Sequence, residues 1–240
     1  MDSSAPLRDP SRVYVIGDIH GRSDLLDRMV REITHDLAVR PAVDSLVVTV
    51  GDYVDRGPDS RGVIERLLNR PFPARFIGLK GNHEVLLEGF LRNPQTAAFW
   101  QRLGGTETML SYGVPVTGVM RGEACAIASR ALAQAIPPSH FQFLASLRTS
   151  LALVKYFICH AGVRPGVPLN QQTEEDLLWI RDAFLASGAD FGKMIVHGHT
   201  PVKTPELLPN RINVDTGAFI TGRLTCAVLE RDGPRFLTAS

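Results

Sequence analysis

The segment VYVIGDIHGRSDLL, residues 13–26, decides the fold because it joins a strand, a loop and a helix. Residues 13–16 are β-branched or aromatic, which favours a short strand, and this run ends at GDIHG, residues 17–21. Ser23 precedes apolar residues that recur at helical spacing as far as Ile33, so the sequence predicts an amphipathic helix capped by Ser23. A strand, a polar loop with glycine and a helix thus form one unit.

The same unit occurs twice more. Ser45–Val50 leads into GDYVDRG (51–57) and a helix at Ser60–Leu68, and Arg75–Leu79 leads into KGNHE (80–84) and another helix. Short buried strands that alternate with helices predict a mostly parallel sheet with right-handed crossovers. The carboxyl ends of parallel strands meet at one edge of a sheet, so we expect the three polar loops to converge there.

After these three units the strand-and-helix pattern is interrupted before it resumes. Residues 93–149 suggest short helices that form a cap, to which we assign no chemistry. The strand pattern resumes at Leu151–Cys159, Met194–Val196 and Arg211–Val214, and Leu224–Glu230 reads as a closing strand. We expect this end to form the second sheet of a sandwich. No repeat or long linker divides the sequence, so residues 1–240 are predicted to form one domain.

Composition excludes several classes of protein. The 26 Lys and Arg against 25 Asp and Glu provide no basic excess for a nucleic-acid backbone. The start MDSSAPLRDP has no signal-peptide pattern, and the apolar runs are too short to cross a bilayer, so we expect a cytoplasmic protein without a membrane partner. The three cysteines are far apart and are predicted to be reduced core thiols.

Five of the seven histidines follow predicted strands beside Gly, Asp or Asn; they are His20, His83, His160, His197 and His199. A single histidine in such a place is more often a hydrogen-bonded structural residue than a ligand. In GDIHG, however, side chains alternate along an extended segment, so Asp18 and His20 project to the same side. Five histidines at equivalent strand ends indicate a shared site.

Each motif alone also has a structural explanation. GDIHG could be a turn with a local Asp hydrogen bond, GDYVDRG a salt-bridged surface turn, and GNHE an Asn helix cap followed by a surface histidine. Together they gather Asp, Asn and His without Cys. That donor set is typical of Mn²⁺, Fe or Zn²⁺ in a hydrolytic centre rather than of a structural zinc site.

The series GDIHG, GDYVDRG, GNHE, HAG and HGH, in this order, resembles the phosphoprotein phosphatase family of calcineurin-like metallophosphoesterases, especially its compact bacterial and phage members. The match spans residues 17–218. The resemblance implies an α/β fold in which a β-sandwich of mixed sheets is flanked by helices and carries a small helical cap at 93–149. It also implies hydrolysis of phosphomonoesters, foremost of phosphoserine and phosphothreonine in proteins.

By the same resemblance, two divalent ions, foremost Mn²⁺ with Fe or Zn²⁺ as alternatives, would lie at the strand ends. One ion would be held by Asp18, His20 and Asp52. The other would be held by Asn82, His160, His197 and the shared Asp52. A hydroxide held by both ions would attack phosphorus directly.

Four further residues receive roles by resemblance. His83 would protonate the leaving alkoxide while Asp55 holds it, and Arg56 and Arg181 would clamp the phosphate, because a guanidinium pairs with phosphate oxygens at two points. Arg181 lies in LLWIRD (177–182), and an ordinary surface arginine on a helix is its alternative.

The chain departs from the family at Lys80, where relatives commonly have arginine, which puts a phosphate contact from that position in doubt. His199 and Asp215 are expected only to orient ligands.

Two other functions stay open. A dinucleoside tetraphosphate hydrolase resembles this family but typically has Ala at the position of Asp55 and Asp at that of Glu84, so both positions favour the phosphatase. Small phosphoesters are a related option, because the cap reveals no recognition code. A scaffold that binds phosphorylated partners without turnover is disfavoured by the full ligand set together with His83. The oligomeric state is left open.

Overall fold

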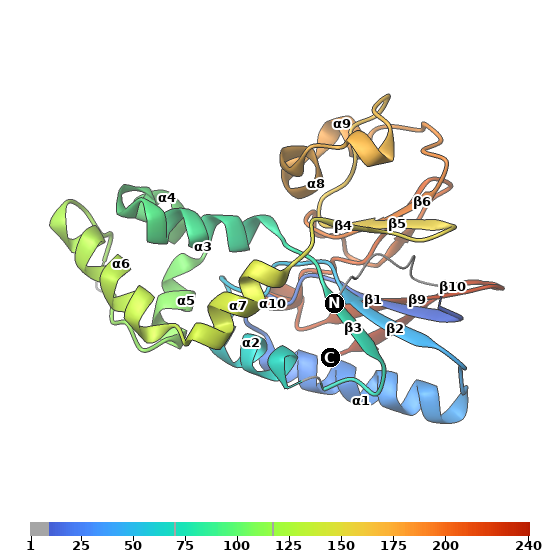
Figure 1. Ribbon diagram of the computed structural model, residues 1–240, viewed down its shortest axis with the longest axis horizontal. Helices are drawn as coiled ribbons and strands as arrows, with labels where there is room; N and C mark the ends of the chain where they lie inside the picture. The colour runs from blue at the N-terminus through green and yellow to red at the C-terminus, as the bar shows by residue number, and fades with distance from the viewer. Residues whose placement is uncertain (1–9, 70, 117) are drawn as a thin grey trace, which may run out of the picture.

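Two five-stranded sheets lie face to face in the computed structural model, which describes residues 10–69, 71–116 and 118–240 (Figure 1). The signal-peptide expectation concerns residues 1–10, nearly all of which lie outside these ranges. The strands of the first sheet are β1 (Arg12–Ile16), β2 (Ser45–Thr49), β3 (Arg75–Gly78), β9 (Leu224–Glu230) and β10 (Gly233–Ala239). Their order is β10-β9-β1-β2-β3, with β1, β2 and β3 parallel.

The register of the parallel strands explains why the loops meet. Ile16 pairs with Thr49 across β1 and β2, and Thr49 pairs with Gly78 across β2 and β3. The three strands therefore end at the same level. The predicted convergence of residues 17–21, 51–57 and 80–84 follows directly from this register.

The second sheet is built from the later part of the chain. Its strands are β4 (Ser150–Ala152), β5 (Tyr156–Cys159), β6 (Met194–His197), β7 (Glu206–Leu207) and β8 (Arg211–Asn213). Their order is β4-β5-β6-β8-β7; β5, β6 and β8 are parallel, and the two edge strands are antiparallel.

Alternating side chains of β1 enter two different cores. Val13 and Val15 pack between the sheets with residues of the second sheet such as Ile158. Tyr14 and Ile16 face the other way. That opposite core contains residues from helices α1 (Ser23–Val39), α2 (Ser60–Leu68) and α3 (Asn82–Arg92). Helices α8 (Glu174–Trp179) and α9 (Asp182–Leu185) cover the outer face of the second sheet. The predicted α/β sandwich flanked by helices is confirmed.

The segment predicted as a cap is helical and projects away from the sheets to the left of Figure 1. It comprises η1 (Pro94–Thr96), α4 (Ala97–Arg102), α5 (Gly105–Ser111), α6 (Glu123–Ala135) and α7 (Pro138–Ser146). We call it the projection. Two short elements complete the chain, η2 (Leu169–Gln171) and α10 (Ala218–Thr221).

The closing strand differs from expectation. Leu224–Glu230 pairs with β1 in the first sheet, antiparallel to it, and not with the second sheet. Its side chains explain this placement, because Ala227 and Leu229 pack in the core between the sheets while Cys226 and Val228 pack in the helix-covered core. Its partner β10 was not predicted.

Two local predictions also needed correction. Leu151–Cys159 is not one strand, because β4 and β5 form an antiparallel pair with Leu153–Lys155 between them. Ser23 does not cap α1, since its hydroxyl donates to Asp59 Oδ2 at 2.5 Å. The three cysteines are free and buried. In the described part of the chain, no helix combines the length and apolar character that a membrane crossing needs.

Candidate active site

The loops after β1, β2 and β3 touch one another through glycines. A Cβ on Gly51, whose φ is +110°, would lie 2.4 Å from the Gly81 nitrogen. A Cβ on Gly57 would lie 1.9 Å from the His20 carbonyl oxygen. Only glycine permits both approaches. The glycines of the motifs thus allow the acidic and imidazole side chains to gather.

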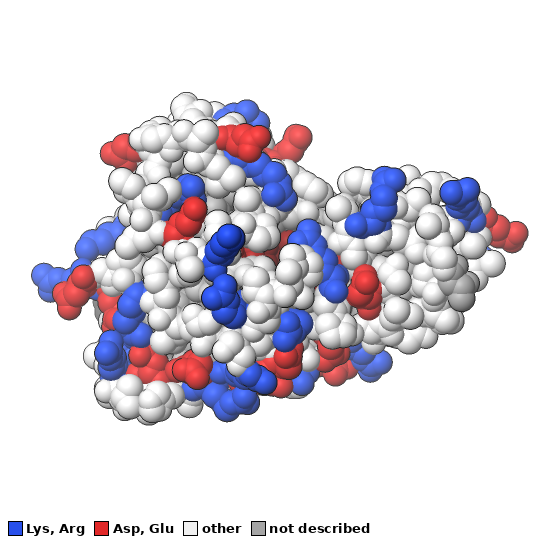
Figure 2. Space-filling model, turned by 180° about the vertical axis from the view of Figure 1, so that it is seen from behind, with Lys and Arg blue, Asp and Glu red and all other residues white. Residues whose placement is uncertain are grey.

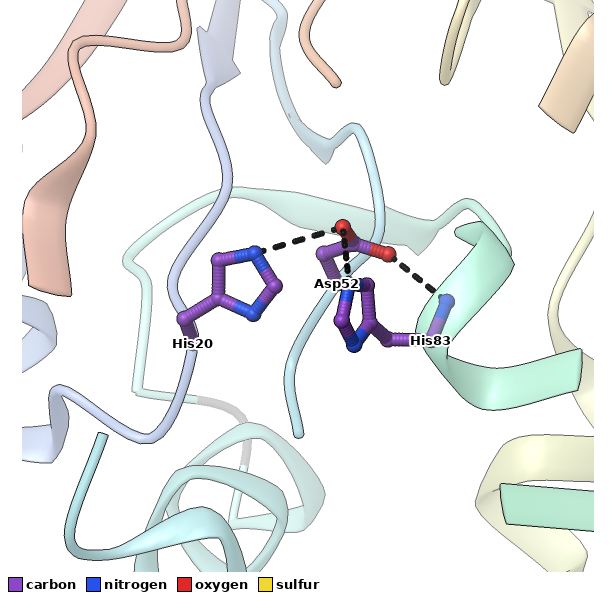
Figure 3. Close-up of side chains that lie close together, drawn as sticks. All are labelled: His20, Asp52 and His83. Atoms are coloured by element: carbon purple, nitrogen blue, oxygen red, sulfur yellow. Dashed lines mark hydrogen bonds and ion pairs between the residues drawn. The ribbon is translucent and has the colours of Figure 1, made fainter. Parts of the chain in front are cut away.

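Asp52 lies at the centre of the gathered side chains (Figure 3). Its Oδ2 is 3.3 Å from His20 Nε2 and 3.9 Å from His83 Nε2, and its Oδ1 is 3.5 Å from His160 Nε2. The backbone N–H of His83 donates to Asp52 Oδ1 at 3.0 Å. Figure 3 shows the His20 and His83 rings side by side, both close to the carboxylate, with ring centres 4.7 Å apart. Asp52 is therefore placed to be shared between two groups of ligands.

The two groups are His20, Asp52 and His83, and Asp52, His160 and His199, and each could hold a metal ion. Asn82 joins the second group, because its Oδ1 lies 2.9 Å from His160 Nε2 and 2.8 Å from His199 Nδ1. Asp18 is buried beside them and accepts the His199 backbone N–H at 3.1 Å.

The structure separates the two histidines of HGH. His197 is still part of β6, and its ring packs edge-on against Phe184, with Nε2 3.4 Å from Arg211 Nη1. His199 has a left-handed φ of 67°, which turns its ring toward His160. Its Nδ1 lies 3.1 Å from His160 Nε2. His199, expected only as an orienting residue, therefore lies with the ligand group, and His197 does not.

The donor atoms fit metal ions. His20 Nδ1 donates to the Val54 carbonyl at 2.8 Å, and His160 Nδ1 donates to the Val50 carbonyl at 3.0 Å. In each ring Nε2 then carries a lone pair that faces the Asp52 carboxylate. Two hydrogen-bond acceptors, the Nε2 atom and a carboxylate oxygen, therefore lie next to each other. A metal ion between them would satisfy both atoms. His199 faces His160 and Asn82 through Nδ1, while its buried Nε2 has no hydrogen-bond partner among the described residues.

Burial keeps the imidazoles in the neutral form that binds a metal, and it disfavours the charge on the neighbouring carboxylates. It lowers the pKa of His20 to about 3 and that of His199 to about 2, so both imidazoles are neutral. It raises the pKa of Asp18 well above its usual value, and the charges of Asp215 and Asp52 raise it further. Burial also raises the pKa of Asp215 to about 6. A cation would relieve this crowding of carboxylates.

His83 and Asp55 form a buried pair. His83 Nδ1 donates to Asp55 Oδ2 at 2.7 Å, and Arg56 Nη2 donates to His83 Nε2 at 3.1 Å. Burial alone would lower the pKa of His83, but the charges of Asp52 and Asp55 outweigh it and raise that pKa. The pair can therefore carry a proton next to the Asp52 carboxylate.

The two predicted clamp arginines have different surroundings. The Arg56 guanidinium lies 4.8 Å from the ring centre of Phe219. Arg181 is exposed between α8 and α9, and its Nη1 donates to Thr200 Oγ1 at 3.3 Å. Lys80 instead pairs with Glu88 at 3.0 Å. The guanidinium of Arg56 is thus beside the ligand groups, and Arg181 is next to the residue that follows His199.

Charged side chains of both signs lie on the face of the molecule seen in Figure 2. Figure 2 shows a hollow between the sandwich and the projection, with acidic side chains at its base and Lys and Arg around it.

Sequence reasoning assigned no role to Glu84 or Phe219. The Glu84 carboxylate accepts the backbone N–H groups of Asp52, Tyr53 and Gly81 at 2.8–2.9 Å and so shapes the Asp52 loop. Burial raises the pKa of Glu84 to about 7. Phe219, in α10, also packs edge-on against His20 with ring centres 5.3 Å apart. Glu84 was visible within GNHE, whereas no sequence pattern singled out Phe219.

Backbone strain is concentrated at the same place. Left-handed φ values occur at five non-glycine residues of the described chain, four in the loops after β1 and β2 and one in the loop after β6: His20, Asp52, Asp55, Arg56 and His199. Each such residue costs on the order of 1–3 kcal/mol and persists only where surrounding contacts hold it. The fold and these loops define a hydrolytic centre for two metal ions.

Comparison with known proteins agrees with this class. Residues 11–233 match the model of the family described as calcineurin-like phosphoesterase. The chain belongs to that family and is a dimetal phosphoesterase.

Among its relatives is serine/threonine-protein phosphatase 2 of Escherichia coli, 30% identical over 89% of this chain and 90% of that protein. An asymmetrical bis(5'-nucleosyl)-tetraphosphatase of Anoxybacillus flavithermus is 28% identical over 88% of this chain and 87% of that protein. The crystal structure of a putative diadenosine tetraphosphatase shares the fold, with a TM-score of 0.65 at 22% identity over 96% of this chain and 95% of the other.

Proposed function

We propose that this chain hydrolyses phosphoserine and phosphothreonine esters in proteins with the help of two Mn²⁺ ions. The observation that carries the proposal is the buried His83–Asp55 pair beside the two ligand groups. A serine or threonine alkoxide is a strong base, so its departure needs a proton donor, which contributes about 10²–10⁴ in rate. The relatives named as serine/threonine-protein phosphatases support the same substrate class.

The ligands of each ion are proposed from the observed grouping together with the resemblance, which gives Asp18 to the first ion and leaves His83, paired with Asp55, as the proton donor. Asp18, His20 and Asp52 would hold one ion, and Asp52, Asn82, His160 and His199 the other, with His199 taking the place that the resemblance gave to His197. Oxygen and imidazole donors without thiolates suit Mn²⁺. When bound, the ions would supply a nucleophilic oxygen near neutral pH and neutralise charge on the phosphate.

The chain's own residues would do the rest. Arg56 and Arg181 would bind the phosphate oxygens as guanidinium forks. Arg56 would then leave His83 Nε2, which would face the leaving oxygen and give it a proton. Asp55 would hold Nδ1–H and so keep the ring oriented.

A direct assay tests this function. The purified chain with MnCl₂ is assayed in parallel on four substrates: phosphoserine, phosphothreonine and phosphotyrosine peptides, and diadenosine tetraphosphate. We expect the highest kcat/KM on phosphoserine or phosphothreonine. Preference for diadenosine tetraphosphate would overturn the proposal, and failure to turn over any phosphoester, including p-nitrophenyl phosphate, would leave a phosphate-binding scaffold.

Hydrolysis of dinucleoside tetraphosphates is the second candidate, favoured by the tetraphosphatases among the relatives. Its leaving group is a nucleotide phosphate, which departs without a strong proton donor. The His83–Asp55 pair therefore favours the alkyl ester.

We also propose that residues 1–240 form one catalytic domain with the projection as its cap, and that the protein is cytoplasmic.

A further inference from the structure

Two residues of the projection reach the Asp55 carboxylate. Trp100, in α4, donates its Nε1–H to Asp55 Oδ2 at 2.8 Å. Thr108, in α5, donates its hydroxyl to Asp55 Oδ1 at 2.7 Å. Trp100, Thr108 and Asp55 are each fully buried. The projection thus contacts the residue that orients His83, although these residues are 45 and 53 positions away from Asp55.

The hydrogen bonds fix the carboxylate in one orientation. Oδ2 accepts from both His83 Nδ1 and Trp100, and Oδ1 accepts from Thr108. The Thr108 hydroxyl has one hydrogen, which it gives to Oδ1, so it accepts the backbone N–H of Asp55 at 2.8 Å. A buried charge of this kind is stable only when donors satisfy it. Rotation of the carboxylate would break bonds at both oxygens.

The backbone of the projection is shaped for this contact. The Gly104 carbonyl accepts the Arg56 N–H at 3.1 Å, and a Cβ on Gly104 would lie 2.5 Å from that nitrogen. A Cβ on Gly105 would lie 2.2 Å from Trp100 Cδ2. Asp55 and Arg56 have φ values of 70° and 67°. The glycine pair therefore lets the projection press against a strained turn and hold it.

We propose that Trp100 and Thr108 are positioning residues for the proton transfer from His83. In that step a water oxygen forms the new bond to phosphorus, the bond from phosphorus to the serine oxygen breaks, and that oxygen takes the proton of His83 Nε2. The proton released by the attacking water passes to solvent, and His83 regains one from solvent. The inference rests on the proposed function, in which His83 is the donor.

Packing is the competing explanation. The Trp100 ring lies against Phe90 of α3, with ring centres 4.8 Å apart, so substitution would also loosen the core. The test therefore needs a measured quantity that does not change when the protein is merely less stable. The leaving group supplies it, because proton donation matters for an alkoxide and much less for p-nitrophenolate.

The experiment compares kcat for a phosphoserine peptide, free phosphoserine and p-nitrophenyl phosphate in Trp100→Phe and Thr108→Val. We expect about a tenfold loss on the two alkyl esters and less than about threefold on p-nitrophenyl phosphate. Thr108→Ser keeps the hydroxyl and should restore near wild-type ratios. Phe90→Leu is the matched control, which should lower Tm without changing the ratio between substrates.

A double-mutant cycle adds a second readout. In an Asp55→Asn background, Trp100→Phe should cause little further loss on the alkyl esters, because the residue acts through Asp55. Equal losses on alkyl and aryl esters, or additive losses in the cycle, would overturn the inference. A wild-type chain that hydrolyses free phosphoserine but not the peptide would overturn only the protein substrate, and one that hydrolyses no ester would overturn both proposals.

Discussion

The two ends of β1 both carry buried charges, but they are arranged in opposite ways. At its start, Arg12 pairs with Glu230 at 2.6 Å. In the same cluster, Arg235 pairs with Asp36 at 2.5 Å. Beyond its end, Asp18 and Asp52 lie among carboxylates and neutral imidazoles. The first cluster is neutralised within the chain, and the second is not.

The pKa values express the same difference. Burial would raise the pKa of Asp36, but hydrogen bonds from Arg235 and Tyr14 outweigh it and lower that pKa. Burial and neighbouring carboxylates together raise the pKa of Asp18. A compensated buried charge thus belongs to the fold, whereas an uncompensated one marks a site where a ligand supplies the missing charge.

Asp52→Asn should have the largest effect. The substitution removes the carboxylate shared by both ligand groups, so we expect nearly complete loss of activity and weaker binding of both ions. Metal content per chain, measured by mass spectrometry after dialysis against Mn²⁺, checks this. Wild-type metal stoichiometry would contradict the shared role.

His83→Asn should lower kcat on alkyl phosphoesters by about 10²–10⁴ while metal content stays unchanged. The reason is that the proton donor is lost while the Asp52 groups remain. Kinetics on phosphoserine peptide and p-nitrophenyl phosphate would measure it, with a smaller loss expected on the second substrate. The same loss on both would remove His83 as the acid.

The two histidines of HGH provide an internal control. His199→Asn should weaken metal affinity more than the roughly 10- to 100-fold typical of residues that only support a ligand. His197→Asn should leave affinity nearly unchanged, since His197 packs on Phe184 and lies in neither ligand group. Titration calorimetry with Mn²⁺ distinguishes them. The reverse order would restore the assignment that the resemblance implied.

Asp36→Asn should leave activity intact and lower the free energy of unfolding by about 1–3 kcal/mol, because Arg12 and Arg235 lose their charged partner. Since the folded pKa of Asp36 lies below its ordinary 3.8, its charge contributes stability above that pH. The contribution disappears as pH falls through the folded pKa. Urea melts of both proteins at neutral and acid pH should therefore converge at low pH; a constant gap would argue against this.

Phe219→Ala should have the smallest effect. The ring supports the Arg56 guanidinium, and an exposed cation–π contact contributes about 0.5–1 kcal/mol, or roughly a two- to fivefold rise in KM. Phe219→Trp should restore KM. The neighbouring Ile220→Ala, at a side chain 72% exposed, is the control and should change nothing. An unchanged KM in Phe219→Ala would show that Arg56 needs no such support.

Much of this arrangement could be predicted, because local patterns determine it. The β-branched runs before GDIHG and GDYVDRG place both motifs at strand ends, and parallel pairing brings them together. The choice between His197 and His199 could not be predicted. It depends on a left-handed backbone at His199, which no side-chain pattern reveals.

Long-range contacts were also beyond the sequence. Leu224–Glu230 joined the first sheet because its side chains fit two cores at once, which only the packed structure shows. Trp100 and Thr108 were placed in a segment without assigned chemistry, since their partner Asp55 lies far away along the chain.

The hydrogen bonds from Trp100 and Thr108 to Asp55 distinguish two kinds of position in the projection. Trp100 and Thr108 are anchored, whereas Phe99 and Leu110, on the same two helices, are 48% and 54% exposed. Directed evolution toward new phosphoesters can therefore vary the exposed pair widely. The anchored pair should be kept, because its loss is expected to lower kcat on alkyl esters about tenfold.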